Sequence, residues 1–215
     1  MSEITKTLVQ CDFDGTITEE DISFILLDTF ANRDWRRLLR DYQKGKISVG
    51  RFNMVAFAMV KANRESLLEV ALSTMRIRPG FPQLLDCCRR KGFRFAIVSN
   101  GLDFYIEEIL RVIGMAEIEV LAAQTSFHPE GLETLYIGPD GNYLNENFKG
   151  AYVNSFLEEG YRIIYVGDGT SDISPSKQCH YVFATGELAT HYKRLNLNCI
   201  SFTDFNEVVR VLELW

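Results

Sequence analysis

Three apolar, β-prone runs in this chain each end in small, polar or acidic residues, and this feature constrains the fold most strongly. The runs cover residues 7–10, 93–98 and 163–166. They lead into Asp12, Ser99 and Asp168. Open α/β folds bind ligands where parallel strands end, at the carboxyl edge of the sheet. The sequence therefore predicts a parallel sheet with a polar site along one edge.

The first of these junctions carries two acids, Asp12 and Asp14, spaced so that an extended chain directs both side chains to one side. Two carboxylates that close repel each other and lose hydration unless a cation joins them. Magnesium suits this role because it prefers hard oxygen ligands and keeps places for water and phosphate oxygens. Taken alone, the stretch is also compatible with a plain polar turn. The polar segments 99–101 and 167–172 argue against that alternative.

Length and composition exclude several classes of protein. The chain has 215 residues with 47% hydrophobic and 24% charged residues, which fits one globular domain or a core domain with an insertion. A net charge of −6 argues against nucleic acid as a partner. No apolar run approaches the roughly 18 residues that a membrane helix needs, and residues 1–7 show no secretion signal. We therefore expect a cytoplasmic protein without membrane contact.

The cysteines and histidines do not form a recognisable metal or disulfide pattern. Five cysteines are scattered without C-x-x-C spacing, so we expect reduced thiols. Three histidines lack the paired spacing of a zinc site.

Residues 19–79 read as four helices without a strand. Apolar residues recur at helical spacing within residues 20–31 and 34–43, and Ser48 and Asn63 are expected to cap two further helices. This block interrupts the sheet after the first strand. We therefore expect an all-helical cap at 19–79, placed over the carboxyl edge of a core built from 1–18 and 80–215.

From residue 81 the pattern changes to alternating helices and strands, which is typical of a Rossmann-like parallel sheet. Gly92 is expected to end the helix that starts at residue 81. Residues 126–144 interrupt the alternation and predict a small β-hairpin insertion with its tip at 138–142. Further strands are expected at 118–122, 181–184 and 199–202, and further helices at 103–113, 150–159, after 172 and from 205, the last capped by Asp204.

The chain resembles the haloacid dehalogenase-like phosphatases in four ordered motifs: D-F-D-G-T at 12–16, S-N-G at 99–101, Lys149, and G-D-G-x-x-D at 167–172. The helical insertion is similar to the small cap of phosphoserine phosphatases. Residues 11–18, 101–105 and 196–205 resemble a methionine-salvage subfamily that acts on a methylthio enol-phosphate. The chain departs from that subfamily in the hairpin region, and its 167–169 segment looks more like phosphoserine phosphatase.

This resemblance implies a reaction through an aspartyl-phosphate. Asp12 would be the nucleophile, and Asp14 would protonate the leaving oxygen and then activate water. Magnesium would be held by Asp12, the backbone carbonyl of Asp14 and Asp168. Asp172 is then either an outer metal ligand or the group that orients Lys149, with a plain helix N-cap as the structural alternative.

The resemblance also implies a phosphate-binding set. The Ser99 hydroxyl and the backbone N–H groups of Asn100 and Gly101 would grip phosphate oxygens, although a serine at a strand end is also common. Lys149 would compensate the charge of phosphate and nucleophile. A lysine at the start of a helix opposes the helix dipole, which itself suggests an anion nearby.

In the cap, Asp21 and Arg51 are the candidate substrate contacts, with Phe24 and Met54 as apolar candidates. Asp21 occupies the place where phosphoserine phosphatases carry a glutamate that meets the substrate amine. It is equally a first-turn helix acid.

The sequence thus predicts a magnesium-dependent phosphomonoesterase acting on a small phosphate ester, with the methylthio enol-phosphate of methionine salvage as the leading substrate. Phosphoserine is the alternative substrate. A receiver-like signalling domain and a non-catalytic scaffold are alternatives of another class. The oligomeric state stays open, with a homodimer as one candidate.

Overall fold

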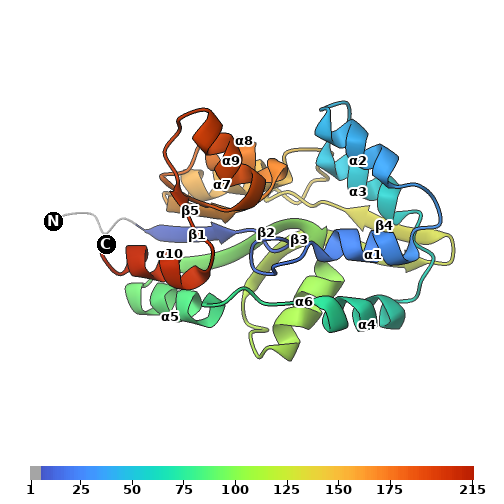
Figure 1. Ribbon diagram of the computed structural model, residues 1–215, viewed down its shortest axis with the longest axis horizontal. Coiled ribbons are helices and arrows are strands. Elements are labelled where there is room, and N and C mark those ends of the chain that lie inside the picture. Colours follow the sequence, from blue (N-terminus) through green and yellow to red (C-terminus); the bar gives the residue numbers. More distant parts are fainter. Residues whose placement is uncertain (1–5) are drawn as a thin grey trace.

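The computed structural model describes residues 6–215, so residues 1–5 of the expected core segment 1–18 lie outside the described part. A seven-stranded sheet in the order β4-β3-β2-β1-β5-β6-β7 forms its centre (Figure 1). Neighbouring strands are parallel except for β3 and β4. This arrangement confirms the predicted α/β fold class. The strands are β1 Thr7–Cys11, β2 Arg94–Leu102, β3 Glu119–His128, β4 Gly131–Leu135, β5 Arg162–Gly167, β6 Tyr181–Ala184 and β7 Ile200–Ser201.

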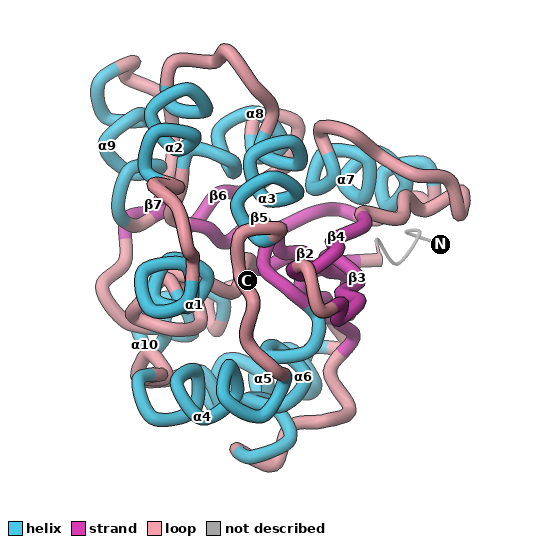
Figure 2. Tube along the Cα trace, turned by 90° about the vertical axis from the view of Figure 1, so that its right-hand side faces the viewer, coloured by secondary structure: helices cyan, strands magenta, loops and turns pink. Residues whose placement is uncertain are grey.

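Helices cover both faces of the sheet. Figures 1 and 2 show α5, α6 and α10 on one face and α7, α8 and α9 on the other. Within residues 6–215, no helix is both long and apolar enough to span a bilayer. The helices are α1 Ile22–Phe30, α2 Arg36–Gln43, α3 Val49–Phe57, α4 Arg64–Thr74, α5 Phe81–Lys91, α6 Asp103–Val112, α7 Phe148–Glu158, the 3-10 turn Thr170–Asp172, α8 Ile173–Ser176, α9 Gly186–Arg194 and α10 Phe205–Leu212.

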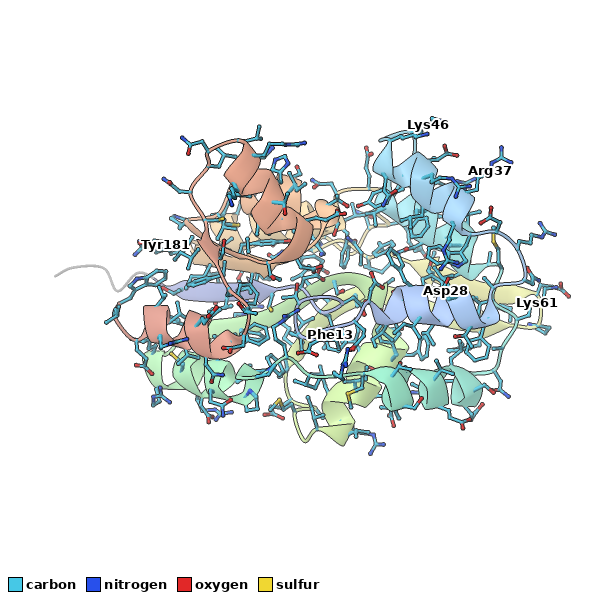
Figure 3. All side chains as sticks on the ribbon, viewed as in Figure 1. Phe13, Asp28, Arg37, Lys46, Lys61 and Tyr181 are labelled. Carbon is cyan, nitrogen blue, oxygen red and sulfur yellow. The ribbon has the colours of Figure 1, made fainter. Side chains whose placement is uncertain are left out.

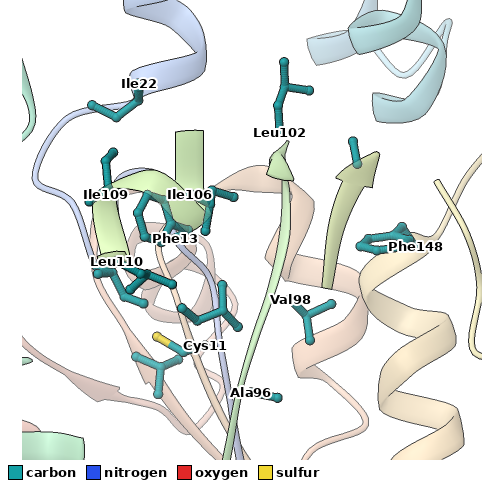
Figure 4. Packing of buried hydrophobic residues seen from close by; sticks show 14 of the residues in the cluster. Cys11, Phe13, Ile22, Ala96, Val98, Leu102, Ile106, Ile109, Leu110 and Phe148 are labelled. Atoms are coloured by element: carbon teal, nitrogen blue, oxygen red, sulfur yellow. The ribbon is translucent and has the colours of Figure 1, made fainter. Parts of the chain in front are cut away.

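Strand β1 lies in the middle of the sheet and is covered on both faces. Leu8 and Val9 are fully buried, as a strand between two helical layers requires. Just beyond the strand, Phe13 lies beside Ile106 and Ile109 of α6 (Figure 4). This packing fixes the backbone on which the first acidic motif stands.

The four helices predicted between residues 19 and 79 are present as α1 to α4. Ser48 accepts a hydrogen bond from the backbone of Arg51, and Asn63 accepts one from Ser66, so both expected N-caps are confirmed. The two connections to the sheet run side by side, because Thr18 and Ile77 form an antiparallel bridge. The segment thus leaves and re-enters the core at one place.

The predicted hairpin is present, but the predicted position of its turn is wrong. The hairpin is formed by β3 and β4, which turn between His128 and Gly131. The glycine-rich stretch expected at the tip makes a second, smaller turn, in which only Ile137 and Tyr143 are bridged. β3 also runs beyond the expected end at residue 122, because it first pairs with β2 and then with β4.

Helix α9 has no clear signature in the sequence. Of its nine residues only Leu188 and Tyr192 are buried, and it begins with Gly186 at φ 52°. Two apolar residues one turn apart are too weak a pattern to predict a helix.

Candidate active site

The polar ends of three neighbouring strands meet at one edge of the sheet. Cys11, the last residue of β1, lies opposite Ile97 of β2 and Val166 of β5, so the residues that follow each strand emerge at the same level. A cavity of about 370 Å³ opens there and is lined by Asp12, Ser99 and other residues of the core and of α1 to α3. The register of the sheet therefore brings the distant sequence motifs into one site.

Asp12 and Lys149 form a buried ion pair at the floor of this cavity. Lys149 Nζ lies 2.6 Å from Asp12 Oδ2 and 2.6 Å from Asp172 Oδ1, and its side chain is 2% exposed. The other oxygen of Asp12 accepts the backbone N–H of Phe13 at 2.7 Å. Burial raises the pKa of Asp12 to about 6, although Lys149 acts in the opposite direction. These two donors therefore hold the Asp12 carboxylate in one orientation.

Lys149 is a buried cation and not a solvated surface charge. Burial alone lowers its pKa, but the charges of Asp12 and Asp172 outweigh burial and raise the pKa above its usual range. Lys149 therefore stays protonated between the two acids. It lies in the first turn of α7, one residue earlier than the helix start expected from sequence.

Asp172 is saturated by donors from the protein. One oxygen accepts from Lys149 at 2.6 Å and from the Tyr165 hydroxyl at 2.7 Å. The other accepts the backbone N–H groups of Asp168 at 3.1 Å and Gly169 at 2.9 Å. Asp172 is therefore well suited to hold Lys149 in place. It is poorly suited to bind a metal ion, because both of its oxygens already accept two hydrogen bonds.

Asp168 faces the cavity beside Asp12. Its Oδ1 accepts the Thr16 hydroxyl at 2.7 Å, and a Cβ at residue 15 would collide with its carboxylate, so glycine is required there. Burial, with the charge of Asp12, raises the pKa of Asp168 to about 8. Carboxylate oxygens of Asp12, Asp168 and Asp172 lie within 4.8 Å of one another. This concentration of buried acid is suited to a divalent cation.

Asp14 points to the other side of the cavity, toward α1 and α6. Its Oδ1 accepts the backbone N–H of Ile22 at 3.0 Å, and its Oδ2 accepts the hydroxyl of Tyr105. Ser23 lies 2.9 Å from the same tyrosine oxygen. Burial raises the pKa of Asp14 well above its ordinary value, and the nearby charge of Asp21 adds to the effect. The surroundings of Asp14 thus favour its protonated form.

Residues Ser99 to Gly101 form an irregular stretch inside β2. The β2–β3 register shifts between Val98 and Leu102, which frees backbone groups from the ladder. Ser99 Oγ accepts the N–H of Gly101 at 3.1 Å, so its own proton remains available for an anion. A Cβ at residue 101 would collide with Asp14 and Tyr105. With glycine at this position the stretch can present the Ser99 hydroxyl to a small anion, while the Gly101 N–H is taken up by Ser99 Oγ.

A second layer of side chains, from α3 and from the segment after β4, fixes this stretch. Asn53 of α3 donates to the carbonyl oxygen of Asn100 at 2.7 Å and to the Tyr136 hydroxyl at 2.6 Å. Tyr136 donates to the same carbonyl at 2.6 Å. The backbone at Asn100 is therefore held by both the helical segment and the hairpin region.

Of the two substrate contacts predicted between residues 19 and 79, only Asp21 lies at the cavity. Asp21 lines the cavity and also caps α1 by accepting the N–H of Phe24 at 2.8 Å. Burial raises the pKa of Asp21 to about 7. Arg51 is exposed, contacts the sulfur of Met54 at 3.7 Å and does not line the cavity, so it is not brought to the site. Phe24 lines the cavity whereas Met54 does not.

Several residues of the site cannot be singled out from the sequence. Tyr105 and Tyr165 each place a hydroxyl on a site carboxylate, and Asn53 and Tyr136 both bind the carbonyl oxygen of Asn100. The available signal is that a buried tyrosine hydroxyl requires a partner. Helical periodicity marks Tyr105 as inward-facing but cannot name that partner.

This fold and site define a phosphatase of the α/β class, which works at the carboxyl edge of a parallel sheet. A sequence model described as haloacid dehalogenase-like hydrolase matches residues 9–175, and the chain belongs to that family.

Relatives of known name agree with this assignment. The chain is 27% identical over 97% of its length to a 2-hydroxy-3-keto-5-methylthiopentenyl-1-phosphate phosphatase of Brevibacillus brevis, of which it covers 96%. It is 30% identical to the protein of the same name from Geobacillus thermodenitrificans, with 94% of each chain covered. These names favour an enzyme over the receiver-like and scaffold alternatives.

Solved structures of phosphoserine phosphatases share the fold. A phospho-aspartyl intermediate analogue of phosphoserine phosphatase superposes with a TM-score of 0.72 at 19% identity, covering 96% of this chain and 99% of the other. Phosphoserine phosphatase from T. onnurineus superposes with a TM-score of 0.71 at 16% identity, covering 99% and 97%. At these identities the likeness concerns the fold alone.

Proposed function

We propose that this chain is a magnesium-dependent phosphomonoesterase that hydrolyses a small phosphorylated metabolite, the methylthio enol-phosphate of methionine salvage, through an aspartyl-phosphate. The observation that carries the proposal is the buried Asp12, held 2.6 Å from Lys149 and facing a cavity with Ser99 and Asp168. The relatives named as methylthiopentenyl-phosphate phosphatases support the choice of substrate.

The donor set of the site fits a magnesium ion. Carboxylate oxygens of Asp12 and Asp168 lie within 4.8 Å of each other, and the loss of hydration on burial raises the pKa of both acids. We propose that these two side chains and the backbone carbonyl of Asp14 hold the ion. Asp172 has all its acceptor positions filled, so we assign it to orienting Lys149. When bound, the ion would supply positive charge beside the transferring phosphoryl group.

In the first half of the proposed reaction, an Asp12 oxygen forms a bond to phosphorus while the bond from phosphorus to the ester oxygen breaks. Asp14, whose pKa is raised by burial, gives its proton to the leaving oxygen. The Ser99 hydroxyl and the N–H of Asn100 hold the phosphoryl oxygens, and the N–H of Gly101, which donates to Ser99 Oγ, keeps that hydroxyl in place. Lys149 keeps the Asp12 carboxylate charged and directed.

In the second half, water attacks phosphorus and the bond between phosphorus and the Asp12 oxygen breaks. Asp14 takes the proton from that water and returns to its starting state. Inorganic phosphate leaves, and the free carboxylate of Asp12 again pairs with Lys149.

We also propose the division into a catalytic core, residues 1–18 and 80–215, and a helical cap, residues 19–79. The paired connections at Thr18 and Ile77 support a single hinge between them. The cap touches the core across the cavity, where Tyr42 and Thr170 hydroxyls lie 3.2 Å apart and Ser48 donates to the carbonyl of Asn145 at 2.8 Å. Closure of the cap would exclude water from the first step.

We place this reaction in the cytoplasm. The five cysteines are all free, which agrees with a reducing compartment. The homodimer remains a prediction, which light scattering on the purified protein tests.

A screen of phosphorylated metabolites with magnesium tests the proposed function. We expect release of phosphate from the methylthio enol-phosphate, and loss of this activity in EDTA and in Asp12→Asn. Asp34→Asn is the matched control, because Asp34 is an exposed cap acid with a side chain 68% exposed. Full activity in Asp12→Asn, or in EDTA, contradicts the assigned roles.

Phosphoserine is the second candidate substrate, since Asp21 lines the cavity and could meet an amine. Turnover of phosphoserine beside the enol-phosphate decides between them. Activity on neither rejects both substrates.

A further inference from the structure

The peptide unit between Asn100 and Gly101 lies directly beside the Ser99 hydroxyl. Its N–H belongs to Gly101 and donates to Ser99 Oγ at 3.1 Å. Its carbonyl oxygen belongs to Asn100 and accepts Asn53 Nδ2 at 2.7 Å and the Tyr136 hydroxyl at 2.6 Å. This peptide unit is therefore held at both ends, by two side chains at its carbonyl and by Ser99 at its N–H.

The Asn100 carbonyl lies outside the regular ladders of the sheet. Paired positions between β1 and β2 end at Ile97, and those between β2 and β3 pass from Val98 directly to Leu102. A backbone carbonyl removed from a ladder requires another donor. The two side chains supply that donor from outside the sheet.

The directions of these hydrogen bonds follow from their chemistry. A carbonyl oxygen can only accept, so Asn53 Nδ2 and the Tyr136 hydroxyl both donate to Asn100. The second proton of Asn53 Nδ2 goes to the Tyr136 oxygen at 2.6 Å, which leaves the tyrosine proton for the carbonyl. Burial raises the pKa of Tyr136 above its usual range, so its hydroxyl stays protonated. Both side chains are 5% exposed, so little water competes for these hydrogen bonds.

The Ser99 hydroxyl is the group that this arrangement affects. A serine hydroxyl rotates about its Cβ–Oγ bond, so its proton has no fixed direction unless the oxygen is held. The Gly101 N–H occupies one acceptor position of Ser99 Oγ and leaves the proton for a ligand in the cavity. Linked hydrogen bonds polarise one another, so the donors on the carbonyl strengthen the N–H of the same peptide unit as a donor.

The two donors come from separate parts of the chain, α3 and the segment after β4. α3 lies directly against that segment, since a Cβ added to Gly50 would lie 2.6 Å from the carbonyl oxygen of Asn145. Tyr136 packs on Phe148, the first residue of α7, with ring centroids 5.0 Å apart. In the described part of the chain, Asn53 lines the cavity and Tyr136 does not. An effect of Tyr136 on a bound ester therefore has to pass through other groups.

We propose that Asn53 and Tyr136 are positioning residues for the phosphate group. Acting through the peptide unit between residues 100 and 101, they direct the Ser99 hydroxyl toward the phosphoryl oxygens. The inference rests on the proposed function, since it names the side chains that set the geometry of its phosphate-binding hydroxyl. Because Asn53 belongs to α3, phosphate binding is thereby linked to the docked position of α3.

A double-mutant cycle between Tyr136 and Ser99 tests the inference. kcat/KM for p-nitrophenyl phosphate with magnesium is measured for the wild type, Tyr136→Phe, Ser99→Ala and the double variant. We expect Ser99→Ala to lower kcat/KM by about 100-fold, because it removes a donor to the transferring group. Tyr136→Phe is expected to lower it by about tenfold, because it displaces that donor. In the Ser99→Ala background, Tyr136→Phe should cost at most about twofold, since its effect passes through the missing hydroxyl.

Asn53→Ala is a second variant that removes a donor from the same carbonyl, and it enters the same cycle. We expect a loss of about tenfold in kcat/KM with Ser99 present and of at most about twofold without it. A direct contact between Asn53 and the substrate would instead give the same loss in both backgrounds, which would overturn the assignment of Asn53.

Tyr152→Phe is the matched control, because Tyr152 also donates to a nearby backbone carbonyl, that of Ile137, at 3.0 Å. Among residues 6–215, Tyr152 is not one that lines the cavity. We expect kcat/KM of Tyr152→Phe to stay within about twofold of the wild type. Urea unfolding of both tyrosine variants measures their stability. A loss of activity in Tyr152→Phe as large as in Tyr136→Phe overturns the inference.

The remaining outcomes separate the inference from the proposed function. Unchanged kcat/KM in Tyr136→Phe and Asn53→Ala, or equal losses with and without Ser99, overturn the inference and leave the phosphatase assignment standing. Full activity of Ser99→Ala overturns the role of Ser99 and the inference with it. A wild-type protein that hydrolyses neither p-nitrophenyl phosphate nor the enol-phosphate overturns the proposed function and the inference together.

Discussion

One buried lysine, Lys149, compensates the negative charge of two buried acids in the site. Lys149 touches Asp12 and Asp172 at 2.6 Å each, and all three side chains are buried. Two buried carboxylates without that cation would face each other across a small gap. The lysine is therefore a structural requirement of this buried cluster.

Lys149→Met is expected to lower the free energy of unfolding by about 3–5 kcal/mol in EDTA, because it leaves two buried carboxylates uncompensated. Urea unfolding followed by circular dichroism measures the loss. Lys177→Met, at an exposed lysine, should change stability by no more than about 0.5 kcal/mol. Equal stability of the two variants would argue against the role of Lys149.

Three acids of the site can be identified from the sequence, because Asp12, Asp14 and Asp168 lie within four residues of the ends of predicted strands. The neutral side chains that bind these acids cannot be identified in this way. Tyr105 reaches Asp14 across 91 positions of the chain, and no local pattern links the two. Arg51 is a candidate by its charge alone, but its place on α3 turns it toward solvent.

At the scale of helices and strands, the sequence predicts a feature correctly where a single residue determines it, as at a helix N-cap. Ser48, Asn63 and Asp204 are each expected to cap a helix, and each side chain accepts backbone N–H groups there. The prediction of the hairpin turn fails because the strongest turn signal, residues 138–142, is not where the strands pair. The ladder instead depends on cross-strand partners such as Phe127 and Leu132, which lie on either side of the actual turn.

Helix caps give a direct test at this scale. Asn63→Ala is expected to destabilise the protein by about 1 kcal/mol, because Asn63 Oδ1 accepts the N–H of Ser66 at 2.9 Å. Thr185→Ala is the control, since Thr185 precedes α9 without a side-chain cap bond. Chemical denaturation of both variants measures the difference. A loss in Thr185→Ala as large as in Asn63→Ala would contradict the capping account.

At the scale of the whole molecule, three segments of the chain meet where the predicted cap leaves the sheet. Arg78, just after the bridge between Thr18 and Ile77, donates to the carbonyls of Gly15 and Thr16 at 2.7 Å each and to that of Thr203 at 2.9 Å. One guanidinium thus connects the first acidic motif, the bridged connection and the segment before α10. The planar fork of arginine is suited to several acceptors at once.

Arg78→Ala is expected to lower the free energy of unfolding by about 2–4 kcal/mol, because three carbonyl groups lose a charged donor. Arg37→Ala serves as the comparison, since Arg37 lies exposed on the outer side of α2 (Figure 3) and should change stability by at most about 0.5 kcal/mol. Thermal and urea unfolding measure both variants. Arg78→Ala with the stability of Arg37→Ala would show that the bridged connection does not depend on the Arg78 guanidinium.

The central claim is that residues from distant parts of the chain converge so that Asp12 carries the phosphoryl group during turnover. Acid quenching of the enzyme during hydrolysis of p-nitrophenyl phosphate with magnesium, followed by peptide mass spectrometry, tests it most directly. We predict the added mass of one phosphoryl group on the peptide that contains Asp12, labile to hydroxylamine and absent from Asp12→Asn. A phosphoryl group on another residue, or undiminished turnover by Asp12→Asn, would contradict the account.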